Sequence, residues 1–160
     1  MPNNKNKIKP VPKSLLPTVF EFSIGPDICH NYHVTWLPDH EMLELRLMGF
    51  GNIGEIDPGS EDPYLKCVKV SASQWRVFWA MLNYIKAWSW EQDYSNSEIL
   101  DGISWHLIIQ YRSKNLVSHG TNAYPESEEL DLKSDSSFEL FIDALNMLLG
   151  DDYIPKKTFY

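Results

Sequence analysis

Apolar side chains recur at every second position in four separate segments of this chain, and this period restricts its fold more than any other feature. The segments are 18–24, 32–36, 43–47 and 103–111. Alternation of this kind is typical of strands that bury one face and expose the other. The chain is therefore expected to build its core against one side of a β-sheet.

Short turns separate the first three of these segments, which predicts an antiparallel meander at the start of the fold. Gly25-Pro26-Asp27 forms the first turn and residues 38–41 the second. A fourth strand is expected over 64–70. Further along the chain, a turn at 113–115 is expected to let 116–120 pair back on the 103–111 strand as a hairpin.

Two other segments repeat their apolar residues at helical spacing, and each begins with a capping box. Ser71 and Gln74 open the first helix, whereas Ser136 and Glu139 open the second, which is expected to stop at Gly150. Strands that come mostly first, followed by helices around a hairpin, favour an α+β fold over a doubly wound parallel sheet.

The expected architecture is a mostly antiparallel sheet, made of the N-terminal meander and the hairpin, with both helices packed on one face. In this arrangement Trp79, Trp105 and Phe141 are expected among the most buried residues. Residues 1–13 carry four lysines and no acid, which predicts a flexible basic arm before a single α+β domain over 14–160.

The first residues lack the apolar segment of a signal peptide, and no apolar run is long enough for a transmembrane helix. We therefore expect a cytoplasmic protein that does not enter a membrane. Cys29 and Cys67 are the only cysteines. They are expected to be reduced, unbridged and buried as small hydrophobic residues.

Charge divides the chain into a basic start and an acidic body. The sequence has 14 basic and 22 acidic residues, net −8, and without the four lysines of the arm ten basic residues face 22 acids, net −12. Such a body repels nucleic acid. Acids gather in two segments, Glu55, Asp57, Glu61 and Asp62 in the first and Glu126, Glu128 and Glu129 in the second. These clusters predict either a solvated surface or a docking surface for a basic protein.

For each candidate chemical motif, a structural interpretation explains the residues better than a catalytic or ligand-binding one. The G-x-G-x-x-G match at 49–54 is followed by acids and a proline, which oppose pyrophosphate binding. His30 and His33 would point to opposite faces of one strand, so a shared metal is not expected. Asp101, before Gly102, is typical of a turn. We expect no metal, no cofactor and no catalytic residues.

Nine residues between the first helix and the second acidic segment form a pattern of W-x-W-x3-Y, D-G-x2-W and G-x-N-x-Y-P. They are Trp88, Trp90, Tyr94, Asp101, Gly102, Trp105, Asn122, Tyr124 and Pro125. From the residues themselves, the pattern predicts a structural role at the helix end, a turn and a hairpin. It resembles a group of small bacterial proteins of unassigned function, some of which are similar to immunity proteins that neutralise toxins.

The resemblance implies a compact α+β scaffold without catalytic residues. The resulting hypothesis is a non-catalytic immunity or inhibitor protein that neutralises a basic partner, such as a toxin, by occlusion. In one alternative, the chain is a subunit of a bacterial or phage defence or anti-defence complex. In another, it is a small enzyme with a pocket lined by Trp and His.

Overall fold

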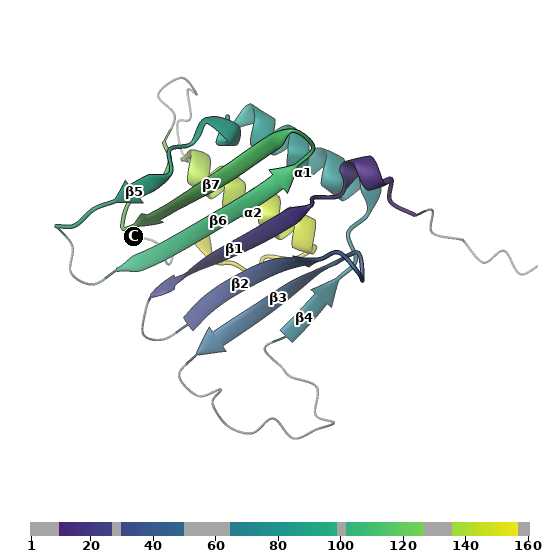
Figure 1. The fold of residues 1–160 in the computed structure, drawn as a ribbon. Helices are drawn as coiled ribbons and strands as arrows, with labels where there is room; N and C mark the ends of the chain where they lie inside the picture. The colour runs from purple at the N-terminus through teal and green to yellow at the C-terminus, as the bar shows by residue number, and fades with distance from the viewer. Residues whose placement is uncertain (1–9, 27–29, 50–64, 99–101, 127–135, 157–160) are drawn as a thin grey trace, which may run out of the picture.

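The computed structural model describes residues 10–26, 30–49, 65–98, 102–126 and 136–156. Seven described strands form one sheet in the order β4-β3-β2-β1-β6-β7-β5 (Figure 1). Their bounds are β1 (Val19–Pro26), β2 (His30–Leu37), β3 (Met42–Gly49), β4 (Leu65–Val68), β5 (Asp93–Ser95), β6 (Ile103–Tyr111) and β7 (Lys114–Thr121).

The β1 strand lies at the centre of the sheet, between β2 of the meander and β6 of the hairpin. It pairs antiparallel with both, from Glu21 opposite Thr35 on one side to Val19 opposite Gln110 on the other. Every pairing is antiparallel except that of β5, a short strand absent from the sequence-based expectation, which runs parallel to β7. The expected mostly antiparallel α+β fold is confirmed.

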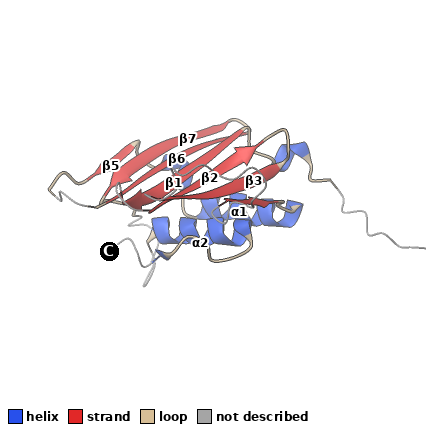
Figure 2. Ribbon diagram, turned by 90° about the horizontal axis from the view of Figure 1, so that it is seen from below, coloured by secondary structure: helices blue, strands red, loops and turns tan. Residues whose placement is uncertain are grey.

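Both helices pack against the same face of the sheet, as Figure 2 shows. The helix α1 (Ala72–Tyr84) begins with the capping box of Ser71 and Gln74, and α2 (Ser137–Leu149) with that of Ser136 and Glu139. Gly150 ends α2 with a φ of 87°, the left-handed conformation that glycine adopts without strain. Two short 3-10 helices complete the described elements: η1 (Lys13–Leu15) precedes β1, and η2 (Ala87–Ser89) follows α1.

The core lies between the sheet and the two helices and is rich in aromatic rings. Trp79, Trp105 and Phe141 are 5%, 2% and 0% exposed, so the expectation that they are deeply buried is confirmed. Trp36 of β2 meets Trp75 of α1 edge to face at 5.6 Å, and Phe22 of the central strand meets Phe141 of α2 edge to face at 5.1 Å. These contacts fix both helices to one side of the sheet.

Three details differ from the sequence-based expectations. The β6–β7 turn is at Arg112 and Ser113, because β7 already begins at Lys114. Cys67 is free, as expected, but exposed, because it alternates with inward-facing residues on the short edge strand β4. Cys29 lies outside the described residues. Val11 packs against the core, so the folded part begins before residue 14.

Within the ranges that the structure describes, no helix has both the length and the apolar character needed to cross a membrane.

Candidate functional site

Most of the acidic residues expected to bind a partner lie outside the described residues. This applies to Glu55, Asp57, Glu61, Asp62, Glu128 and Glu129, whereas Glu126 is described and exposed. The strand ends that precede the two segments, Gly49 of β3 and Thr121 of β7, lie four strand positions apart in the sheet order. At ~4.8 Å per strand this is about 19 Å. This distance separates the strand ends that precede the two segments.

The pattern that ends in G-x-N-x-Y-P holds the beginning of β6 and the end of β7 together. Asn122, with a φ of 55°, accepts a hydrogen bond from the Ile103 N–H through Oδ1 at 2.9 Å. A Cβ at position 102 would lie 1.6 Å from that oxygen, so only glycine leaves enough room for the Asn122 side chain. Asp101 lies outside the described residues.

Trp105 and Gly120 form the centre of the same cluster. The Trp105 indole Nε1–H donates to the Ala123 carbonyl at 2.9 Å. A Cβ at Gly120 would lie only 2.6 Å from that Nε1 and 2.7 Å from the Tyr94 carbonyl oxygen. Glycine at position 120 therefore allows β5, β6 and the segment after β7 to approach one another.

The remaining pattern residues also serve the core. Trp90 packs edge to face against Trp105, Tyr124 packs on Phe138, and the Trp88 indole donates to Asn83 on α1. Pro125 is buried. The pattern residues that the structure describes thus have structural roles in the core. A functional site is therefore sought on the surface.

The face of the sheet opposite α1 and α2, here called the open face, has no described helix over it (Figure 2). Strand register places six polar residues of this face side by side across the sheet. Each is the direct cross-strand neighbour of the next, in the order Arg46, His33, Ser23, His106, His119 and Asp93. We call this set the polar row.

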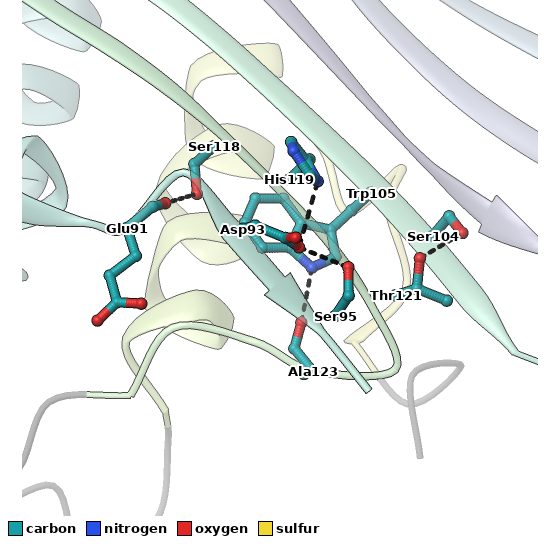
Figure 3. A network of polar contacts seen from close by, with 9 residues as sticks. All are labelled: Glu91, Asp93, Ser95, Ser104, Trp105, Ser118, His119, Thr121 and Ala123. Carbon is teal, nitrogen blue, oxygen red and sulfur yellow. Dashed lines mark hydrogen bonds and ion pairs between the residues drawn. The ribbon is translucent and has the colours of Figure 1, made fainter. Parts of the chain in front are cut away.

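The best-defined part of the polar row lies on β5, β6 and β7. The rings of His106 and His119 have centroids 6.4 Å apart, and His119 Nδ1 lies 3.6 Å from Asp93 Oδ1. Ser95 also donates a hydrogen bond to Asp93, as Figure 3 shows. Cross-strand neighbours on one face of a sheet lie close enough to interact directly. The row is therefore a continuous strip of groups that can exchange hydrogen bonds with a partner.

The described strands of the open face carry more negative than positive charges. The described strand residues of this face include three carboxylates, Glu21, Glu44 and Asp93, and one guanidinium, Arg46, which lies 3.2 Å from the Glu44 carboxylate. Partial burial, and after it the charge of Arg46, lowers the pKa of His33 below its ordinary value of 6.5. With neutral histidines, these groups give the described strands of the open face a net charge of −2.

Apolar side chains lie beside the polar row. Ile108 of β6 and Val117 of β7 are directly opposite each other, and Val117 is 37% exposed. An apolar pair next to polar and acidic groups is the mixture that protein interfaces commonly use.

The geometry of the open face supports catalysis or metal binding less than it supports the binding of a protein partner. No group of three His, Cys, Asp or Glu residues could hold a metal ion in the part of the chain that the structure describes. His119 and Asp93 have side chains 42% and 60% exposed, so water is not excluded from the pair. His33, His106 and His119 lie on the open face, whereas Trp75, Trp79 and Trp105 lie under the sheet. These histidines therefore share no pocket with those Trp rings.

The hairpin turn expected at 113–115 does not bring the histidines of the polar row together. A turn at Arg112 and Ser113 puts His106 opposite His119, whereas a turn centred on Lys114 would put His106 opposite Asn122. A correct turn assignment would have revealed this pair, since hairpin register follows from the turn.

Fold and surface together define a sheet-and-two-helix protein with one layer of helices and one weakly acidic sheet face that no described helix covers. Comparisons with protein-family models, curated proteins and solved structures gave no significant match to this chain. The resemblance to immunity proteins therefore stays a hypothesis that only the residue pattern supports.

Proposed function

We propose that this chain is a non-catalytic binding protein of the immunity or inhibitor type, which neutralises a basic protein partner by covering its working surface. The observation that carries the proposal is the open face of the sheet. It offers a broad surface with an excess of carboxylates, an apolar pair and a row of hydrogen-bonding groups. Complementary charge steers a basic partner to such a surface.

The rigidity of this surface supports binding by occlusion. Each open-face residue belongs to a strand paired in register, and the opposite side of the same strands packs on the aromatic core. Side chains held in this way lose little conformational freedom on binding, which favours affinity without a change of fold. The acid-rich segment 50–64 follows β3, the strand that carries Glu44, and it can add carboxylates to the same interface.

An enzyme remains the alternative from another class, and the Asp93–His119 pair is the observation that favours it. The side chains of His119 and Asp93 are 42% and 60% exposed, whereas catalytic acid–base groups commonly act in sites from which water is excluded. We therefore assign the polar row to recognition.

The test uses the native chain and two charge-reversed variants as baits in a lysate of the native host. The first variant, Glu21→Lys with Glu44→Lys, reverses two open-face carboxylates that flank Thr35 in register. The matched control, Asp151→Lys with Asp152→Lys, makes the same change of charge at two exposed residues after α2. Captured proteins are identified by mass spectrometry, and their activity is then measured with and without each bait.

We expect the native chain and the control to retain a basic protein and inhibit it, whereas the open-face variant loses both properties. Glu21 is exposed and Glu44 is partly exposed, and ion pairs near the surface contribute only ~0–1 kcal/mol to folding. The variant is therefore expected to stay folded, which circular dichroism checks. Equal capture by all three baits, an acidic partner, or a captured protein whose activity is unaffected would contradict the proposal.

A further inference from the structure

A pocket of about 420 Å³ lies between α1, η1 and the turn that joins β6 to β7. Its lining includes Arg76, Arg112 and Lys114 and no acidic residue. In a chain with 22 acidic and 14 basic residues, three cations around one cavity oppose the overall charge. We call this site the cationic pocket.

Hydrogen bonds orient a neutral donor toward the same pocket lining. Asn83 Oδ1 accepts from both Trp88 Nε1 and Lys114 Nζ, each at 2.8 Å. Two donors on one oxygen fix which end of the amide is the acceptor, so the Asn83 NH₂ group remains to donate. Ser113 adds a hydroxyl to the lining. The polar groups of the pocket can thus act together as donors to an acceptor.

Arg112 lines this pocket and has an unusual backbone conformation. Its φ is 55°, a region that favours glycine or asparagine, and its Nε donates to the Ser14 carbonyl at 3.1 Å. One nitrogen of the guanidinium is therefore occupied, and the two terminal nitrogens remain available for a bidentate contact. Within the described part of the chain, no carboxylate forms an ion pair with Arg76, Arg112 or Lys114.

The aromatic wall of the pocket does not offer a ring face to a ligand. Trp79 stacks on Tyr111 at 3.9 Å and on Trp75 at 5.2 Å, and the Arg112 guanidinium lies 5.0 Å from the Tyr111 ring centroid. Because these faces are covered, a nucleobase would gain little from stacking here. Recognition in this pocket depends on charge and hydrogen bonds.

We infer that the cationic pocket binds a small polyanion that carries phosphate or carboxylate groups. Guanidinium groups match both anions in geometry and charge, and the Lys114 ammonium adds a point charge beside them. The volume lies within the range of small-molecule sites, ~300–1,000 Å³. This site is under the sheet at the hairpin turn, so it goes beyond the binding function proposed for the open face.

The experiment measures binding of two probes, pyrophosphate and citrate, to the native chain by isothermal titration calorimetry at low and physiological salt. Tryptophan fluorescence gives a second readout, since Trp88 shares Asn83 with Lys114 at the pocket. We expect binding at low salt that weakens as salt increases. A preference for pyrophosphate assigns the ligand to phosphates, and a preference for citrate assigns it to carboxylates.

Variants decide whether the pocket is responsible. Asn83→Asp keeps an oxygen that can accept from Trp88 and Lys114 but replaces the donor with a negative charge, and it is expected to weaken binding more than tenfold. Arg76→Gln is expected to weaken binding at least fivefold. The control Lys69→Gln removes an exposed cation outside the pocket lining and is expected to leave affinity within twofold.

No binding of either probe by the native chain at millimolar concentration would overturn the inference. So would equal weakening by Lys69→Gln and Arg76→Gln, because this result would reflect net charge alone. Circular dichroism confirms that each variant is folded. All three substitutions leave the open face unchanged, so this test is separate from that of the proposed function.

Discussion

Replacing Gly120 with alanine is expected to destabilise the fold, because three atoms already occupy the space that a Cβ would need. The added carbon would lie 2.6 Å from the Ala123 carbonyl oxygen, 2.6 Å from Trp105 Nε1 and 2.7 Å from the Tyr94 carbonyl oxygen. Two of these atoms are backbone and the third belongs to a Trp that is 2% exposed. The backbone of β7 or its neighbours must therefore move.

The size of the effect follows from three contributions. Forcing extra volume into a packed site costs ~1–3 kcal/mol, and loss of the hydrogen bond from Trp105 to Ala123 costs about 1 kcal/mol more. Alanine also lowers the conformational entropy of the unfolded chain, which stabilises the folded protein by ~0.4–1 kcal/mol. The net loss is about 1–3.5 kcal/mol, which for a domain of this size corresponds to a decrease in melting temperature of about 2–14 °C.

Urea unfolding followed by tryptophan fluorescence measures this loss. Gly150→Ala is the matched control, since a Cβ there has no atom within 4 Å and meets only the strain of a φ of 87°, about 1–2 kcal/mol. A double-mutant cycle with Trp105→Phe, which removes the indole nitrogen, is expected to reduce the cost of Gly120→Ala by at least about 0.5 kcal/mol. A Gly120→Ala protein as stable as the native chain, or no coupling to Trp105, would refute this reasoning.

Three further predictions concern single side chains. Asn146→Ala is expected to lower the free energy of unfolding, measured in urea, by about 2–4 kcal/mol, because the buried Asn146 amide bonds both the N–H and the C=O of Ile154. Stability is expected to fall as the pH decreases below 6.5, because folded His33, with its lowered pKa, takes up a proton less readily than unfolded His33; His33→Gln flattens this part of the profile. The exposed Cys67 thiol is expected to react with a thiol reagent in the native protein, and the Cys67→Ser variant is expected to have one reactive thiol fewer.

Each of these predictions has a clear contrary result. Unchanged stability of Asn146→Ala would mean that water replaces its two hydrogen bonds without cost. A pH profile identical in His33→Gln and the native chain would assign the acid sensitivity to other groups. Protection of the Cys67 thiol until the protein unfolds would mean that the β4 edge is covered in solution.

Local patterns in the sequence were sufficient to predict the principal elements of this fold. Alternation gave β1, β2, β3 and β6, and the two capping boxes placed the beginnings of both long helices at Ser71 and Ser136. These signals depend on residues close in the chain, which is why they can be read without a structure.

Features that depend on distant residues could not be predicted in the same way. The three-residue strand β5 has too few positions for a period, and its pairing depends on Gly120 of β7 leaving room beside Tyr94. The polar row needs the register of five strand pairs, and the error at the hairpin turn hid its central His106–His119 contact. The cationic pocket joins η1, α1 and the hairpin turn, from Leu15 to Lys114, so no sequence window contains it.

The central position of β1 also has a consequence for how the chain folds. The meander and the hairpin can each form from neighbouring segments, but the sheet is complete only when β1 pairs with β6, where Val19 meets Gln110. Closing such a long loop costs chain entropy before the contacts stabilise it. The β1–β6 junction is therefore the expected rate-limiting step of folding, and substitutions there should slow refolding more than substitutions within the meander.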